Sequence, residues 1–409
     1  MSRDTKEFVV AKMTALERRS SLSLACIFAL RMLGLFLILP VFSIEASRYS
    51  GGSDVSLVGL AMGIFGLTQA CLQLPYGLLS DYLGRKRVMI GGLLIFAAGS
   101  LIAASADSVI GLLIGRAIQG AGAISAVVTA TIADQTRDEV RTKSMALVGV
   151  SAVLMFALSL FFSPILVGVI GLSGLFSLTA VLSMIGIVVV VLWVPRVALV
   201  TARGARGRLR DVLGLSNLRR LDVGAFVLHA VQLAMWLAVP QMLVDAGLSR
   251  DHHWWVYLPA VLLSFVMMSL LLFPLERKGF LRAVFLGAIG LLALVECGFY
   301  WAAENHLNVS VLMALLFLFF CSFNVLEASM PSMVSRQAPA ESRGAALGAF
   351  NTMQSLGLFF GGAVGGWLIE HTGLSGLFSA CALAILLWLA SAWAMSPETV
   401  KANTQAEKA

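Results

Sequence analysis

Five ionisable side chains lie inside long apolar stretches of this sequence, where a charge is costly. They are Arg31, Arg116, His229, Glu296 and Glu327. At the centre of a hydrocarbon layer a charged residue costs about 2.5–3.5 kcal/mol, so such a side chain normally faces water or a partner. The chemistry open to this set is proton transfer and the binding of charged groups. Each residue also has a structural interpretation, a hydrogen bond within a packed interior.

Glu327 is the best candidate for carrying a proton. Phe320, Asn324 and Pro331 share its face if the segment is helical. A carboxyl that lines a water-accessible path can take up and release protons, whereas one that bonds to a helix end is structural. We expect Glu327 to have the first role and Asn324 to line the same path.

Two arginines need partners inside the apolar stretches. Arg116 has Gln119 and Gly120 on its helical face, and backbone carbonyls of neighbouring helices are its structural alternative. Arg31 lies between Phe28 and Leu35. It could meet an anionic group of a substrate or balance a buried acid, and both interpretations stay open.

His229 begins a stripe that continues with Gln232, Trp236 and Pro240 at helical spacing. The stripe could line a substrate path, and an imidazole titrates near neutral pH. A lone histidine in such a segment is more often a satisfied polar contact. Glu296 lies toward the outer end of its segment, where we expect the side chain to reach the interface.

Uncharged polar residues add further candidates for a substrate path. One is Gln119, and the others form two pairs, each one helical turn apart: Gln69 with Gln73, and Asn351 with Gln354. Hydrogen bonds between helices explain each pair equally well.

The elements that hold these residues are membrane spans. Hydrophobic residues make up 59% of the chain and charged residues 12%, with a mean hydropathy of +0.91. A span needs about 20 apolar residues. Twelve such blocks are present, and we predict an all-α polytopic membrane protein with twelve transmembrane helices. The blocks are 21–44, 55–79, 88–106, 109–133, 144–168, 173–195, 221–243, 254–275, 283–302, 308–333, 344–369 and 373–396.

The basic residues define the topology. With the N-terminus in the cytoplasm, 25 Lys and Arg residues fall on the inner side and only Arg48 and Arg250 on the outer side. This asymmetry satisfies the positive-inside rule, predicts both termini in the cytoplasm, and explains the net charge of +7 without nucleic acid. The predicted divisions are an N-terminal tail at 1–20, a six-helix bundle at 21–195, a linker at 196–220, a second bundle at 221–396 and a tail at 397–409.

Several motifs resemble those of the major facilitator superfamily. The loop after the second span reads Gly77-Leu-Leu-Ser-Asp81-Tyr-Leu-Gly84-Arg85-Lys86-Arg87, and the fourth span contains Arg116-Ala-Ile-Gln119-Gly120-Ala-Gly122. The fifth span ends in Ser163-Pro164, where the drug/proton antiporters of the family usually have Gly before Pro. The stretches Leu30–Gly34, Gly66–Ala70 and Phe323–Ala328 are similar to the YajR type of bacterial transporter, whose soluble C-terminal domain we expect this chain to lack.

The resemblance implies specific roles for these motifs. In the cytoplasmic loop, we expect Gly77 to permit close helix approach, Gly84 to make the turn, and Asp81, Arg85 and Asp134 to form a latch that breaks and reforms. Anchoring of the loop at the headgroups is the alternative. The resemblance also links Arg116 to proton movement, and Gly120, Gly122, Ser163 and Pro164 to helix packing.

Other function classes find little support. The sequence has no phosphate-binding loop that ends in Lys-Ser/Thr, and its five histidines form no nucleophile–base set. We therefore expect no enzyme activity, no metal site at Asp251-His252-His253, and no cofactor.

The resulting hypothesis is alternating access by rocking of 21–195 against 221–396, with protons exchanged for an exported amphipathic or drug-like compound. The expected site is the bacterial inner membrane, and the expected working form is a monomer driven by the proton gradient. A proton symporter or facilitator for a nutrient is one alternative. A non-transporting sensor or scaffold on the same fold is another.

Overall fold

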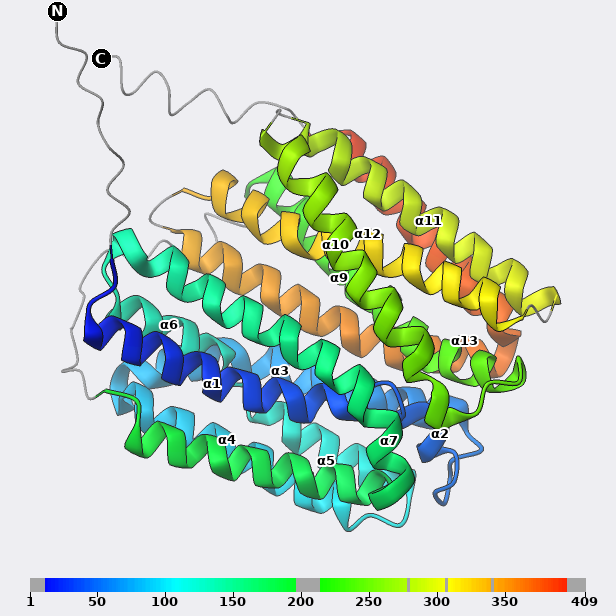
Figure 1. Ribbon diagram of the computed structural model, residues 1–409, viewed down its shortest axis with the longest axis horizontal. Coiled ribbons are helices and arrows are strands. Elements are labelled where there is room, and N and C mark those ends of the chain that lie inside the picture. Colours follow the sequence, from blue (N-terminus) through cyan, green and yellow to red (C-terminus); the bar gives the residue numbers. More distant parts are fainter. Residues whose placement is uncertain (1–11, 196–213, 278–279, 306–307, 340–341, 396–409) are drawn as a thin grey trace, which may run out of the picture.

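A computed structural model describes residues 12–195, 214–277, 280–305, 308–339 and 342–395, and Figure 1 shows its arrangement. Residues 196–213 of the predicted 196–220 linker, most of the N-terminal tail, the C-terminal tail, and the basic residue Lys278 lie outside the described residues. The first half comprises α1 (Ala15–Ile38), α2 (Phe42–Ala46), α3 (Val55–Leu83), α4 (Arg85–Ala104), α5 (Val109–Ala121), α6 (Ser125–Gln135) and α7 (Asp138–Leu192). The second half comprises α9 (Ser216–Asp245), η1 (Arg250–His252), α10 (Trp254–Arg277), α11 (Leu281–Asn305), α12 (Val309–Gln337) and α13 (Arg343–Trp393).

Within this described part, ten helical segments are long and apolar enough to cross a membrane. Two of them, α7 and α13, have 55 and 51 residues. At about 1.5 Å per residue they are more than twice as long as the roughly 30 Å hydrocarbon layer, so each must fold back. The break falls at Gly171 and at Gly373, whose φ values of 67° and 73° suit a residue without a Cβ. Each of these helices supplies two spans, which gives the predicted twelve.

The fourth span differs from the continuous helix that the sequence predicts. It divides into α5 and α6, and residues 122–124 between them are not helical. The backbone is crowded here: a Cβ on Gly122 would lie 2.5 Å from the Gly92 carbonyl oxygen, and one on Gly120 would lie 2.2 Å from that of Phe65. The two glycines thus allow the fourth span to pack directly on α3 and α4.

A stripe of glycines joins the two halves. Helix α3 packs on α13 so closely that a Cβ on Gly59 would lie 2.3 Å from the Gly362 carbonyl oxygen. A Cβ on Gly63 would lie 2.6 Å from the Phe359 oxygen, and one on Gly66 would lie 2.3 Å from that of Ser355. This contact runs from the outer end of both helices to their middle.

Polar contacts reinforce the same side of the molecule. Arg250 of η1 donates to Glu45 of α2 at 3.2 Å. Glu370 of α13 accepts from the backbone N–H of Ser56 at 3.1 Å, so it caps the first turn of α3. Figure 1 shows α2 at the end of the molecule opposite the start of α1, which follows the N-terminal tail. Since the termini are predicted to be cytoplasmic, these contacts close the outer side.

Candidate functional site

Seven polar side chains from six helices meet where the two halves face each other at mid-depth. We call them the central polar cluster. It consists of Arg31 (α1), Gln69 (α3), Ser125 (α6), His229 (α9), Glu327 (α12), and Gln354 and Ser355 (α13).

Arg31 anchors the N-terminal side of this cluster. Its side chain is buried, and its two terminal nitrogens donate to Ser125 Oγ at 3.2 Å and Gln69 Oε1 at 3.0 Å. The guanidinium also lies 5.4 Å from the centre of the Phe96 ring. Nε has no hydrogen-bond partner in the described part of the chain, and no ion pair there involves Arg31. Its positive charge is therefore held by neutral oxygens and a ring.

Glu327 and His229 form the C-terminal side. Glu327 Oε2 lies 3.5 Å from His229 Nε2, and the Gln354 amide donates to Oε1 at 3.2 Å and Oε2 at 3.4 Å. His229 Nδ1 lies 2.9 Å from the Ala225 carbonyl oxygen. The Glu327 side chain keeps 40% of its surface exposed, whereas His229 keeps 9%. An accessible carboxyl thus stands beside a nearly buried imidazole.

Gln69 connects the two sides. Its Nε2 donates to Ser355 Oγ at 3.0 Å while its Oε1 accepts from Arg31. Ser355 follows Gln354 in α13, so adjacent residues of one helix contact the arginine side and the carboxyl side. Sequence reasoning missed Ser125 and Ser355, because serine is common in membrane helices and nothing in its spacing marks a contact with another helix.

Arg116 lies apart from this cluster. It is buried inside the N-terminal half, where it donates to Gln119 Oε1 at 2.9 Å and to the Met62 carbonyl at 3.4 Å. Its guanidinium stacks 4.8 Å from the centre of the Phe65 ring, and Gln119 donates onward to Ser100 at 2.7 Å. These contacts tie α3, α4 and α5 together, so neither Arg116 nor Gln119 is brought near Glu327.

Glu296 does not reach the interface. Its side chain is 1% exposed, and Oε1 has no hydrogen-bond partner among the described residues. The expectation of an interfacial position was wrong because α11 packs against both α12 and α13, which enclose the carboxyl. Glu296 therefore belongs to the interior of the C-terminal half.

The remaining pathway candidates divide between structural and accessible positions. Asn324 donates to Ser264 of α10 at 2.8 Å, which is a contact between helices, and Gln73 is buried in α3. Gln232 and Asn351 are half-buried.

Trp236 lies on the outer side of the polar cluster in an aromatic group. Its ring centre is 6.4 Å from that of Phe156 in the other half, 6.2 Å from Phe320 and 5.2 Å from Tyr257. The Trp236 carbonyl oxygen also accepts from Ser43 of α2 at 3.3 Å. Trp236 thus adds an aromatic layer to the closed outer side.

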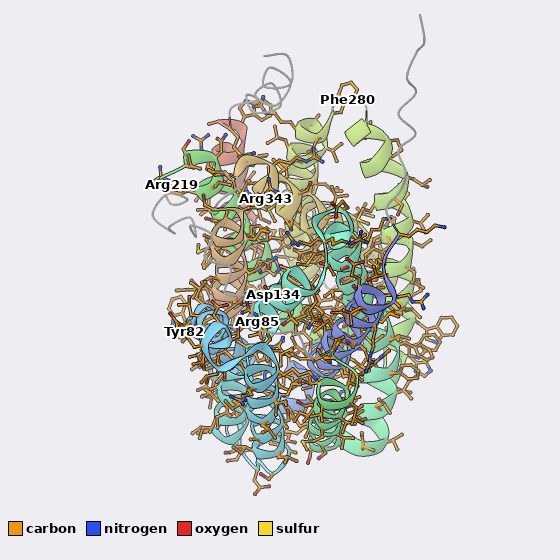
Figure 2. All side chains as sticks on the ribbon, turned by 90° about the vertical axis from the view of Figure 1, so that its left-hand side faces the viewer. Tyr82, Arg85, Asp134, Arg219, Phe280 and Arg343 are labelled. Atoms are coloured by element: carbon orange, nitrogen blue, oxygen red, sulfur yellow. The ribbon has the colours of Figure 1, made fainter. Side chains whose placement is uncertain are left out.

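The cytoplasmic loop places Arg85 between two carboxylates. Arg85 lies 2.8 Å from Asp81 and 2.8 Å from Asp134, and it also donates to Ser80 Oγ at 2.5 Å. Gly84 makes the turn between α3 and α4 with a φ of 92°. Figure 2 shows Arg85 and Asp134 side by side, with Arg219 and Arg343 on the other half.

Gly77 behaves differently from the expectation, and Ser163 makes a specific contact between helices. A Cβ on Gly77 would meet only Ala126, at an ordinary 3.7 Å, so this conformation does not need a glycine there. Ser163, which precedes Pro164 in α7, donates through Oγ to the Leu37 carbonyl at 2.5 Å. The serine thus adds a bond between α7 and α1 that glycine could not make.

Comparison with known proteins assigns this architecture. The profile of the Major Facilitator Superfamily matches residues 24–362 and 223–409. The Escherichia coli inner membrane transport protein YajR is 39% identical over 388 residues, which cover 94% of this chain and 85% of the relative. The chain belongs to the major facilitator superfamily. A second relative is an uncharacterized transporter of Buchnera aphidicola, which is 37% identical over 85% of this chain and 90% of its own length.

Solved structures of other family transporters share the fold at low identity. The human organic anion transporter MFSD10 covers 93% of the chain and 100% of its own length, with a TM-score of 0.67 and 19% identity. The nucleoside transporter NupG covers 91% and 99%, with a TM-score of 0.71 and 15% identity. These structures share the fold, and the family profile and the E. coli relative make the chain a multi-pass membrane transporter and not an enzyme.

Proposed function

We propose that this family member is a proton-coupled antiporter that exports a small amphipathic compound across a bacterial inner membrane. The observation that carries the proposal is Glu327, an accessible carboxyl that faces an imidazole inside the bundle. A carboxyl with access to water can release its proton, and a neighbouring base gives that proton a defined place to bind. Transport then needs a substrate that binds when the proton has left.

Alternating access follows from the contacts between the halves. The outer side is closed by the α3–α13 glycine stripe and by Glu45 and Glu370, so the accessible surface of Glu327 serves the inner side in this conformation. Opening the outer side requires these contacts to separate while the inner ends approach. The Arg85 bridge to Asp81 and Asp134 lies within the N-terminal half and would latch one conformation of that half, and Arg116 would keep the half rigid during the movement.

Similarity to named proteins supports export and location. The E. coli relative is called an inner membrane transport protein. The multidrug resistance protein MdtH of Aeromonas salmonicida is 35% identical over 91 residues, 22% of this chain and 23% of its own length. The central polar cluster is built within one chain, which fits a transporter that works as a monomer. The distribution of Lys and Arg supports cytoplasmic termini.

A proton symporter is the second candidate, and the charge of Arg31 favours it. With Glu327 ionised, the cluster contains one positive and one negative charge. An anionic substrate at Arg31 would make the cluster negative unless Glu327 also bound a proton, so anion and proton would bind together. A cationic or neutral substrate gives no such preference and suits exchange.

Flux measurements in proteoliposomes separate these functions. Vesicles with purified protein would either be loaded with ethidium or be placed in a buffer that contains an anionic dye such as carboxyfluorescein, and an acidic outer pH would then be imposed. Antiport predicts that the proton gradient accelerates ethidium efflux. Symport predicts that the gradient drives carboxyfluorescein uptake from outside. A scaffold would show neither movement nor counterflow above protein-free vesicles.

A further inference from the structure

The two ring nitrogens of His229 have different hydrogen-bonding partners. Nδ1 lies 2.9 Å from the carbonyl oxygen of Ala225, one turn earlier in α9. A carbonyl oxygen can only accept, so Nδ1 must carry a hydrogen. A neutral imidazole has one N–H, which leaves a lone pair on Nε2. Nε2 therefore carries a proton only when the ring is a cation.

That second nitrogen faces a carboxylate. Glu327 Oε2 lies 3.5 Å from His229 Nε2. If both groups were deprotonated, two lone pairs would face each other and repel. The contact is attractive in two forms: a carboxylic acid that donates to a neutral imidazole, or an imidazolium that donates to a carboxylate. Both forms contain the same single proton between the two residues.

The groups around His229 and Glu327 are compatible with a single proton held between the two residues. Gln354 of α13 donates to both Glu327 oxygens, which suits either form because an oxygen remains free to accept. From α12, the Phe323 ring lies edge-on to the imidazole at 6.0 Å. Helix α13 approaches so closely that a Cβ on Gly357 would lie 3.1 Å from His229 Cβ. The other charge of the cluster, Arg31 of α1, connects to α13 through Gln69 and Ser355.

We infer that His229 and Glu327 hold one proton in common, and that this proton is the link between α9 and α12. The inference rests on the proposed function and makes it more specific. When the proton leaves for water, a carboxylate and a neutral imidazole remain. Either the two residues separate, or the ring moves its hydrogen from Nδ1 to Nε2 and loses the bond to Ala225. Proton release is thereby converted into a change in the packing of the C-terminal half.

The test needs no substrate, since it follows proton binding in the purified, lipid-reconstituted chain. Infrared difference spectra report the protonated carboxyl of Glu327, assigned by its loss in Glu327→Gln. Nitrogen NMR of labelled histidine reports His229, assigned by its loss in His229→Asn. Asparagine can still donate to Ala225 but offers nothing in place of Nε2. The matched control is His371→Asn, because the exposed His371 makes the same bond through Nδ1 to the carbonyl four residues earlier, at 2.9 Å.

The expected result is coupled titration. His229→Asn should weaken proton binding at Glu327 about tenfold or more and lower the pH midpoint of its carboxyl band by about one unit. If the proton rests on the ring, Glu327→Gln should lower the midpoint of His229 in the same way. His371→Asn should change neither. Independent midpoints, with Glu327 unmoved in His229→Asn, would overturn the inference.

Failure of this inference and failure of the proposed function give different results. If midpoints are independent but Glu327→Gln still abolishes proton-driven flux, antiport stands and the shared proton does not. If midpoints are coupled but proton-driven flux survives Glu327→Gln, the shared proton is structural and the antiport proposal is wrong.

Discussion

Substitution of Gly362 by alanine should open the outer side of the transporter. A Cβ at this position would lie 2.4 Å from the Gly59 carbonyl oxygen and 2.8 Å from the Gly63 nitrogen. Both are backbone atoms of α3, so no side chain can move aside. Ordinary contact begins near 3.4 Å, and the two helices would have to separate by about 1 Å. The strain exists only while the outer side is closed.

The magnitude follows from the cost of overpacking. An extra methyl group in a tight interior typically costs about 1–3 kcal/mol, and 1.4 kcal/mol is a factor of ten. The ratio of outward-closed to outward-open molecules should therefore fall about 5- to 150-fold. The matched control is Gly344→Ala in the same helix, where an added Cβ meets nothing within 4 Å.

Cysteine labelling from outside the cell measures this shift. A single cysteine would replace Ser43, a half-buried residue of the outer contact, in a background without the five native cysteines. A membrane-impermeant maleimide should label it several-fold faster in Gly362→Ala than in Gly344→Ala, with both proteins showing wild-type size-exclusion profiles. Equal labelling rates would refute the claim that the α3–α13 stripe holds the outer side closed.

Three further predictions concern charged residues. Arg85→Ala should reduce transport about tenfold while changing the melting temperature little, because a partly exposed ion pair contributes only about 0–1 kcal/mol to stability. Arg87→Ala should leave both transport and melting temperature unchanged, as measured by flux and thermal melts. Glu370→Ala removes the acceptor for the Ser56 N–H in the first turn of α3 and should speed outer labelling several-fold; an unchanged rate would remove Glu370 from the outer closure. Arg31→Gln should weaken the binding of anionic amphiphiles at least tenfold but not that of neutral analogues, as measured by calorimetry; equal losses would argue against the symport candidate.

Much of the fold could be predicted from sequence because the membrane leaves few options. Apolar length sets the number of spans, and the distribution of Lys and Arg sets their direction. The predicted gaps between spans, at 169–172 and 370–372, lie within a few residues of the observed chain reversals at Gly171 and Gly373. The break at 122–124 was not predicted, because its cause is the close approach of α3 and α4, which no local pattern reveals.

The candidate site was predictable residue by residue but not as an arrangement. Burial cost singled out Arg31, Glu327 and His229, since each is polar within an apolar segment. Helical periodicity relates residues of one helix only, so it could not bring His229 of α9 to Glu327 of α12. The same cost also singled out Arg116 and Glu296, which the structure places inside separate halves. A buried charge marks an important position, but packing decides whether that position lies on the pathway.

The role of Glu327 is the central claim, and proton-driven flux in Glu327→Gln tests it most directly. Proteoliposomes containing wild-type or variant protein would be compared in ethidium efflux driven by an acidic outer pH and in ethidium exchange without a pH gradient. The account predicts that Glu327→Gln loses the driven efflux and keeps the exchange, because the neutral amide no longer binds or releases a proton while the pathway stays intact. Driven efflux at the wild-type rate in Glu327→Gln would contradict it.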